Sequence, residues 1–319
     1  MINILLLSAG TNACYHIARV LKEKFPQQFK IVGTDINEKH LIPTAAFLDV
    51  FYKGPRIKEE GYYEYILNVC KKENINFLIP SFDDDQKLFY PENKDLVNLN
   101  VQSLGVSKQT LPIYDDKLQM NMFLEKNGFP VPKHYEAKDC LPDNMYMVKP
   151  IHGVGSVGAG AKKGSDILNL DTNGNIIQEL CSEPEVTMEC FCYETLFSCV
   201  CRQRIATKSG VCTKGRIFID EDLREIGKKF AQKIKVPYIF NLQFMKNTKG
   251  AYVITDVNLR SAGGMSMAYT AGWDEVSALA KIMLKRPLAE IESTLPNKIP
   301  ETFIVRAYTD IVTRRDYNR

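Results

Sequence analysis

Three side chains that could bind a metal ion and a phosphate follow one another at alternate positions near the C-terminal end of the chain. They are Asp256, Asn258 and Arg260, and they end a strand-like segment over residues 252–260. Alternate residues of a strand point to one face, so the three groups should lie side by side. Oxygen ligands suit a hard cation such as Mg²⁺, and a neighbouring arginine neutralises phosphate charge. A solvated strand face would show the same alternation.

The segment before it, residues 239–245, is also strand-like, and an Asn-Thr-Lys-Gly turn sequence separates the two. The two segments should therefore pair as an antiparallel hairpin. A tight turn predicts that Asn241 lies opposite Asp256 and Gln243 opposite Ile254. In that register the Gln243 amide points to the same side as the carboxylate, which adds an oxygen ligand to the face.

A second pattern is an apolar strand that ends in Lys149 and runs into a glycine-rich loop. The loop contains Gly153, Gly155, Ser156, Gly158 and Gly160. Glycine lets backbone N–H groups approach a phosphate, and the lysine adds a positive charge beside them. No helix start follows the loop, as a dinucleotide fold requires, and the lysine precedes the loop, unlike the order in kinases. A lid over phosphates fits better, and an ordinary glycine-rich turn is the alternative.

In this order the motifs resemble the ATP-grasp superfamily. The resemblance rests on Lys117 at a helix start, Val-Lys-Pro before the glycine loop, a strand at residues 177–180, Glu185 soon after it, and the final Asp-x-Asn-x-Arg. The motifs and their order are most similar to those of the carbamoyl phosphate synthase large-subunit-like branch and its carboxylate–amine ligase relatives. The resemblance covers nearly the whole chain and is most specific over residues 115–264. It implies an α/β protein, with an N-terminal doubly wound pre-ATP-grasp domain followed by an ATP-grasp α+β fold.

The resemblance also implies a site. The nucleotide would be held by Lys117, Lys149, Gly153, Gly155, Ser156, Gly158, Glu179, Leu180 and Glu185, with the backbone of Glu179 and Leu180 at the adenine and Glu185 at the ribose. The metal ligands would be Gln243, Asp256 and Asn258. Catalysis would fall to Arg260, Arg204 and Lys149, and the acceptor carboxylate would meet Ser261, Gly263 and Gly264. An exposed cation is the alternative reading of Arg204. The family usually has Glu where Asp256 stands, so a carboxylate bridge between two metal ions is in doubt.

The chain divides into three predicted parts. Residues 1–112 alternate strands and helices and form the pre-ATP-grasp domain. Residues 113–290 form the ATP-grasp domain, with a lid subdomain over about 113–183, and residues 291–319 form a C-terminal segment. The Ser-Phe-Asp-Asp-Asp sequence at residues 81–85 follows a strand, where open α/β sheets bind ligands, and helix capping is its alternative.

Composition fits a protein of two or three domains, with 319 residues, 45% hydrophobic, 25% charged and a net charge of +3. The scattered basic residues predict neither nucleic-acid nor membrane binding, and the opening apolar segment lacks the basic n-region expected of a signal peptide. The nine cysteines lack zinc-site spacing and are expected to be small core residues in a reducing compartment. We therefore expect a cytoplasmic protein, with a homodimer as its assembly.

The predicted function is an ADP-forming ligase that uses ATP and Mg²⁺ or Mn²⁺ to activate a small-molecule carboxylate as an acyl-phosphate for attack by an amine. Two alternatives are phosphorylation of bicarbonate or carbamate, as in carbamoyl phosphate synthase, and a noncatalytic nucleotide-binding accessory protein. An NAD-dependent oxidoreductase is the weakest alternative, because residues 8–13 keep a single glycine of the dinucleotide fingerprint.

Overall fold

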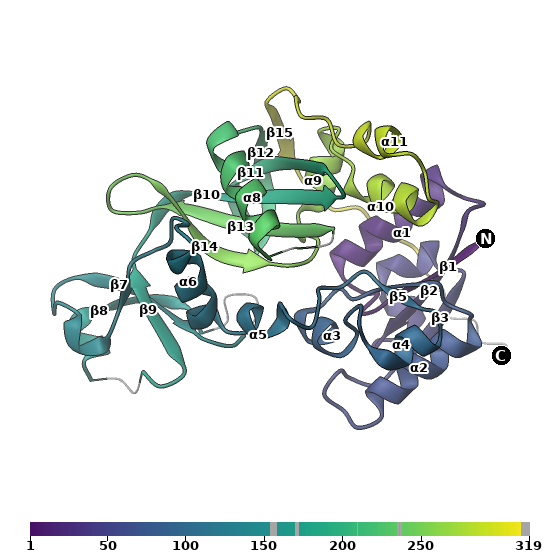
Figure 1. The fold of residues 1–319 in the computed structure, drawn as a ribbon, viewed down its shortest axis with the longest axis horizontal. Coiled ribbons are helices and arrows are strands. Elements are labelled where there is room, and N and C mark those ends of the chain that lie inside the picture. The colour runs from purple at the N-terminus through teal and green to yellow at the C-terminus, as the bar shows by residue number, and fades with distance from the viewer. Residues whose placement is uncertain (154–157, 170–171, 209, 235, 237, 314–319) are drawn as a thin grey trace.

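The computed structural model describes residues 1–153, 158–169, 172–208, 210–234, 236 and 238–313. Two residues of the predicted glycine loop, Gly155 and Ser156, lie outside them. The described chain forms three sheets (Figure 1). In this view the parallel sheet lies at the right, the four-stranded sheet at the left, and the six-stranded sheet above and between them. The predicted N-terminal α/β domain is present, and the two antiparallel sheets follow it in the chain.

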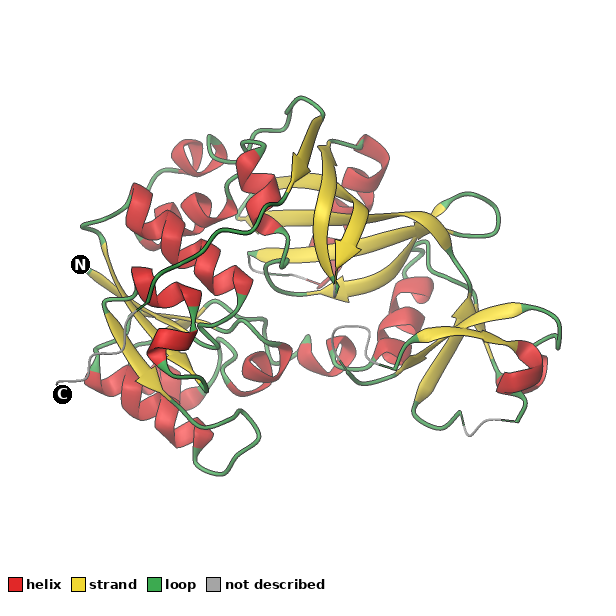
Figure 2. Cartoon of the chain, turned by 180° about the vertical axis from the view of Figure 1, so that it is seen from behind, coloured by secondary structure: helices red, strands yellow, loops and turns green. Residues whose placement is uncertain are grey.

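The N-terminal sheet is parallel, with strand order β3-β2-β1-β4-β5. Its strands are β1 (Ile2–Leu6), β2 (Phe29–Asp35), β3 (Val50–Lys53), β4 (Phe77–Ile79) and β5 (Gln102–Ser103). Its helices are α1 (Asn12–Lys24), α2 (Tyr62–Lys72), α3 (Asp83–Leu88) and α4 (Lys94–Asn98), with 3₁₀ turns η1 (Lys39–Leu41) and η2 (Pro43–Phe47). Seen from behind, helices surround this parallel sheet, whereas the parts of the chain that form the two antiparallel sheets contain more strand than helix (Figure 2).

Helix α1 shows how the sequence dictates this part. The Thr11 hydroxyl caps it by accepting a hydrogen bond from the Cys14 amide at 3.2 Å. Ile17, Val20 and Leu21 repeat at helical spacing and are buried. They join a core that also contains Trp273 from the C-terminal half. The outer face of α1 is therefore covered by the C-terminal half.

The four-stranded sheet has the order β6-β9-β7-β8 and is antiparallel. It contains β6 (His134–Tyr135), β7 (Met145–Pro150), β8 (Gly160–Lys163) and β9 (Asn175–Glu179), with 3₁₀ turn η3 (Ala137–Asp139) and helices α5 (Leu111–Tyr114), α6 (Lys117–Lys126) and α7 (Gly164–Ile167) around it. Asp116 caps α6 by accepting a hydrogen bond from the Gln119 amide, and Gly128 follows the end of the helix with φ +69°.

The six-stranded sheet has the order β14-β13-β10-β11-β12-β15. Its strands are β10 (Ser182–Tyr193), β11 (Leu196–Lys208), β12 (Val211–Phe218), β13 (Ile239–Lys246), β14 (Tyr252–Asn258) and β15 (Thr302–Val305). The remaining helices are α8 (Glu221–Ile234), α9 (Met265–Thr270), α10 (Glu275–Met283) and α11 (Leu288–Glu292). One face of the sheet packs on α8 through Phe230, and the buried Cys190 and Cys199 belong to this core.

The predicted domain limits coincide with helices instead of linkers. α5 runs across residues 112 and 113, and α11 runs across residues 290 and 291. The C-terminal segment also adds β15 to the edge of the six-stranded sheet, next to β12. The three-part division remains a prediction, but the C-terminal segment belongs to the six-stranded sheet. Within the described residues, no helix has both the length and the apolar character needed to cross a membrane.

Candidate active site

The predicted hairpin forms, but in a different register. Asn241 lies opposite Asn258 and Gln243 opposite Asp256, so the predicted partners Asp256 and Ile254 were wrong. The register shifts after Gln243, where Thr255 is an extra residue in β14, and the Thr255 hydroxyl donates to the Gln243 carbonyl at 3.2 Å. This bulge brings the Gln243 side chain directly opposite the carboxylate, closer than the sequence indicated.

The polar face continues across the six-stranded sheet. Gln243 lies opposite Thr187 of β10, which in turn lies opposite Arg202 of β11. In the next row Asn241 lies opposite Glu189. The alternate residues of these strands are apolar and pack on α8. The sheet therefore has one apolar face and one face of charged and amide side chains.

A cavity of about 630 Å³ lies against this polar face. The four-stranded sheet contributes Met147 and Lys149, α6 contributes Lys117, and α3 contributes Asp83. The predicted site residues that line the cavity are Lys117, Lys149, Gly153, Glu185, Arg204, Gln243, Asp256, Asn258 and Arg260. A volume of this size is typical of small-molecule sites.

Other predicted residues lie outside the described lining. The Glu179 carboxylate accepts hydrogen bonds from the Lys133 amide and the Thr248 hydroxyl. Its neighbour Gln178 lines the cavity, and Glu179 does not. Gly158 has a φ of +79° and lies close to Pro150. The others that do not line it are Leu180, Ser261, Gly263 and Gly264. Their predicted contacts with nucleotide or acceptor remain predictions.

Lys149 is held on the floor of the cavity by the bulge. Its Nζ donates to the Thr255 carbonyl at 3.1 Å. Burial lowers the pKa of Lys149, and the nearby Asp256 carboxylate opposes that shift. Burial raises the pKa of Asp256, while the charges of Lys149 and Lys117 oppose the rise. A cation or a polyanion that entered the cavity would therefore meet charged groups that have few protein partners.

Lys117 links α6 to the described end of the glycine loop. Its Nζ donates to the Gly153 carbonyl at 2.6 Å, and its amide donates to Ile151 at 3.1 Å. The His152 ring contacts the carbonyl of Asp115 at 2.9 Å. The start of α6 therefore contacts the described residues that lead into the loop, and Lys117 lines the cavity where it could meet a phosphate.

Glu185 and Arg204 form an ion pair with each other. The Arg204 Nη2 also donates to the Gly210 carbonyl at 3.0 Å, and its side chain is only 17% exposed. The alternative reading of Arg204 as an exposed cation is therefore wrong. The pair places Arg204 beside the residue predicted to bind ribose.

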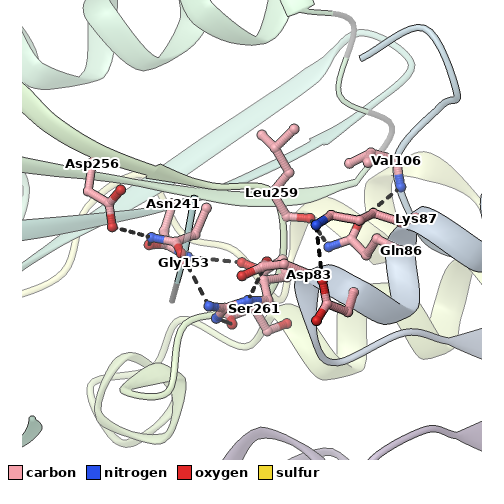
Figure 3. A network of polar contacts seen from close by, with 12 residues as sticks. Asp83, Gln86, Lys87, Val106, Gly153, Asn241, Asp256, Leu259 and Ser261 are labelled. Carbon is pink, nitrogen blue, oxygen red and sulfur yellow. Dashed lines mark hydrogen bonds and ion pairs between the residues drawn. The ribbon is translucent and has the colours of Figure 1, made fainter. Parts of the chain in front are cut away.

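Arg260 connects the cavity to the N-terminal domain. Its Nε donates to Asp83 Oδ1 at 3.0 Å, and its Nη2 donates to Asn258 Oδ1 at 3.2 Å. The Asn241 side-chain amide donates to the Arg260 backbone carbonyl at 2.9 Å. Figure 3 shows this network, from Asp256 through Asn241 to Asp83. Asp83 thus contacts the cavity, while Asp85 of the same acidic run accepts a hydrogen bond from the backbone of Phe82, the N-cap residue of α3.

Comparison with known proteins agrees with this geometry. Residues 4–104 match the family model "PylC-like, N-terminal domain", and residues 172–310 match "ATP-grasp in the biosynthetic pathway with Ter operon". The chain thus combines a PylC-like N-terminal domain with an ATP-grasp domain. No curated protein sequence matches it.

Solved structures with a similar fold share little sequence with this ATP-grasp chain. The Staphylococcus aureus N5-carboxyaminoimidazole synthetase complexed with ADP has a TM-score of 0.70 at 13% identity, over 94% of this chain and 80% of its own. Biotin carboxylase from Campylobacter jejuni has a TM-score of 0.72 at 15% identity, over 92% and 73%. The Thermotoga maritima N5-carboxyaminoimidazole ribonucleotide synthetase has 0.67 at 18%, over 90% and 77%.

Two buried residues of the ATP-grasp sheet were missed from the sequence. The Arg202 Nε donates to Glu189 Oε1 at 3.0 Å, and both side chains are almost fully buried. The Arg202 guanidinium lies against Gly264, where a Cβ atom would come within 2.3 Å of it. The sequence feature that could have revealed Glu189 is the alternation of the polar residues Glu185, Thr187 and Glu189 in β10. The same kind of alternation pointed to Asp256 in β14.

Glu275, at the start of α10, was missed as well. Among the described residues neither of its carboxylate oxygens meets the geometric criteria for a hydrogen bond, and burial raises its pKa to about 8. The charge of Glu189 adds to this rise, and the nearby Ser261 opposes it. A single acid at a helix start gives no sign in the sequence that it will be buried.

The predicted metal ligands form an incomplete set. Asp256 supplies one carboxylate, and its Oδ2 accepts from Asn258 Nδ2 at 3.4 Å, while Gln243 supplies an amide. Across the described parts of the chain, no three Asp, Glu, His or Cys side chains gather as they do in an all-protein metal site. Such a donor set fits Mg²⁺ that takes its remaining oxygens from phosphates and water.

Proposed function

We propose that this ATP-grasp protein is an ADP-forming ligase that activates a carboxylate as an acyl-phosphate for attack by an amine. The observation that carries the proposal is the common wall of one cavity, where Lys117, Lys149, Asp256, Asn258 and Arg260 meet. Positive groups next to oxygen ligands are what phosphoryl transfer requires, since the protein mainly positions and neutralises charge.

The cavity has room and chemistry for ATP. Met147 and Ile176 of the four-stranded sheet face Met245 and Ile254 of the hairpin, and together they offer an apolar slot for adenine. Glu185 would accept hydrogen bonds from the ribose hydroxyls, with Arg204 holding its carboxylate in place. Lys117 and Lys149 would then contact the phosphates.

Gln243, Asp256 and Asn258 would hold Mg²⁺ or Mn²⁺ beside those phosphates. When bound, the ion neutralises charge on the phosphate oxygens and polarises the phosphorus toward attack. The Asp256 carboxylate is the charged ligand, and Asn258 is oriented by its contact with Arg260.

In the proposed reaction a carboxylate oxygen attacks the γ-phosphorus, and the bond to the β–γ bridging oxygen breaks to release ADP. The amine then attacks the carbonyl carbon of the acyl-phosphate, inorganic phosphate leaves, and the amine loses a proton. Arg260 and Lys149 neutralise the transferred group. No covalent enzyme intermediate is needed. The cytoplasmic location and the homodimer remain predictions from the sequence.

The decisive experiment traps the acyl-phosphate. Enzyme, MgATP, hydroxylamine and a panel of carboxylates that includes bicarbonate should give ADP and, with the correct acid, a hydroxamate. Lys149→Met should lower both about a hundredfold or more, because it removes a charge that acts on the transferred phosphate. Products that consist of AMP and pyrophosphate would rule out the mechanism.

Lys162→Met is the matched control. Lys162 lies in the same sheet, opposite the buried Tyr146, and so on the face turned away from Lys149 and the cavity. Its loss should leave ADP release unchanged. Equal activity of wild type and Lys149→Met would show that Lys149 has been given the wrong role.

A further inference from the structure

A smaller pocket of about 40 Å³ lies next to the cavity of about 630 Å³ in which ATP is proposed to bind. Arg260 is the residue that the described linings of the two have in common. The pocket forms where α1 and the end of β4 meet α10 and the residues that follow β14. It therefore lies between the N-terminal domain and the six-stranded sheet, with the guanidinium at its junction with the larger cavity.

The interior of the pocket is mostly aliphatic. Ala13 and Ile17 of α1, Leu104 after β5, Ile239 of β13 and Leu279 of α10 contribute to its walls. These side chains come from elements far apart in sequence, so the pocket is a product of domain packing. An apolar wall of this kind favours a hydrocarbon group over a hydrated one.

The polar groups of the wall already have partners in the protein. Gln86 donates to the Leu259 carbonyl at 2.9 Å and accepts from the Val106 amide at 3.1 Å (Figure 3). The Ser81 hydroxyl lies 2.8 Å from Cys14 Sγ. Among the described residues that line the pocket, none is acidic and Arg260 is the cation. The wall thus offers an anion the Arg260 guanidinium, which also pairs with Asp83 at 3.0 Å, and it has no carboxylate for an ammonium group inside.

The size of the pocket limits what can enter it. A cavity that holds a single water molecule has a volume of roughly 10–15 Å³. The 40 Å³ of this pocket therefore leaves room for about three or four carbon atoms. Ser261, which was predicted to meet the acceptor carboxylate, lines the same pocket beside Arg260.

We propose that this pocket holds the hydrocarbon chain of the substrate and that the substrate is a small aliphatic monocarboxylate without an amino group. Its carboxylate would lie at Arg260, on the side that opens toward the phosphates of ATP. This inference rests on the proposed ligase function, because it names the acid that the ligase activates.

Binding can be measured without turnover. The protein is saturated with Mg²⁺ and a nonhydrolysable ATP analogue, and the straight-chain acids from acetate to hexanoate, with their 2-amino counterparts, are titrated by calorimetry. Each methylene buried in the pocket should tighten binding about fourfold, up to about four carbons, and longer chains should bind more weakly. The 2-amino acids should bind at least tenfold more weakly, since the wall offers an ammonium group no partner.

Two variants change the size of the pocket. Ala13→Leu fills it and should weaken the best acid at least tenfold, while the affinity for the ATP analogue changes less than twofold. Leu279→Ala enlarges it and should move the preferred chain length upward by one or two carbons. Ala289→Leu, an exposed position on α11 outside both cavities, is the matched control and should change neither.

The outcomes separate the two proposals. Acids that bind with the expected length dependence but give no hydroxamate would support the pocket and overturn the ligase. ADP formation with bicarbonate alone, unaffected by Ala13→Leu, would overturn the pocket and leave the ligase standing. Tighter binding of the 2-amino acids, or no binding of any aliphatic acid, would also overturn the pocket assignment.

Discussion

Asp256 is the residue on which the proposed metal site depends most. It is the only acidic residue in β13 and β14, and the bulge at Thr255 sets it opposite Gln243. The sequence predicted the three groups of the face because alternation along a single strand is local. It did not predict their distance from Gln243, because that depends on a one-residue bulge which no local pattern announces.

Asp256→Asn should lose most of the Mg²⁺-dependent ADP release, at least about tenfold, with little change in stability. The substitution keeps the shape of the side chain and removes the charge that a hard cation requires. Initial rates across a Mg²⁺ titration, together with thermal unfolding, provide the measurement. Asp222→Asn, at an exposed position of α8, should behave like wild type. Identical titration curves for Asp256→Asn and wild type would remove Asp256 from the metal site.

Arg204 can be assigned by comparing it with its partner. Because it pairs with Glu185, we expect Glu185→Gln and Arg204→Met both to raise the KM for ATP about tenfold and to change kcat much less. Steady-state kinetics with varied ATP give both constants. If Arg204→Met lowers kcat strongly while Glu185→Gln does not, the arginine acts on the transferred phosphate, as the sequence first suggested.

At the scale of elements, the loop between β14 and α9 rests on a buried ion pair. Arg202 and Glu189 come from neighbouring strands, and the Arg202 guanidinium occupies the space where a side chain at residue 264 would begin. The sequence showed glycines in this loop but not which of them is required. That requirement comes from a contact between segments about sixty residues apart in sequence, which periodicity cannot show.

Two adjacent glycines of the loop give a sharp comparison. Gly264→Ala would put a Cβ atom 2.3 Å from Arg202 Cζ, whereas Gly263→Ala would meet nothing within 4 Å. We expect Gly264→Ala to destabilise the fold by about 1–3 kcal/mol and to raise the KM for the carboxylate, because the loop must move. Gly263→Ala should do neither. Denaturant unfolding and kinetics on the two variants measure both effects, and equal behaviour would show that the loop does not depend on the Arg202 contact.

At the scale of the whole molecule, the N-terminal domain and the ATP-grasp part form one packed unit. The core around α1 includes Trp273 and Leu279, and Asp83 reaches Arg260 across the junction. Lys87 also bridges Asp84 and Asp115, at 3.0 and 2.5 Å. The sequence predicted each part because hydrophobic periodicity is local. It placed the boundaries inside helices, since the contacts that join the parts have no local signature.

Buried Glu275 predicts how the stability of this unit depends on pH. Its pKa is raised from 4.5 to about 8, so the folded protein keeps a proton that the unfolded chain releases. The resulting stabilisation is complete below about pH 4.5, declines as the pH rises, and is gone above about pH 8. The contribution to the free energy of unfolding should fall by at most about 1.4 kcal/mol per pH unit within that window.

Glu275→Gln should remove this decline, because a neutral amide replaces the buried acid and has no proton to lose. Urea unfolding of wild type and variant across the same pH window gives the difference between their free energies of unfolding, which cancels the groups that titrate alike in both. Glu292→Gln, an exposed position on α11, should keep the wild-type slope. If wild type and Glu275→Gln lose stability in parallel as the pH rises, Glu275 is ionised in the folded protein. Its carboxylate would then be stabilised by the neighbouring Ser261 more strongly than burial and the charge of Glu189 destabilise it.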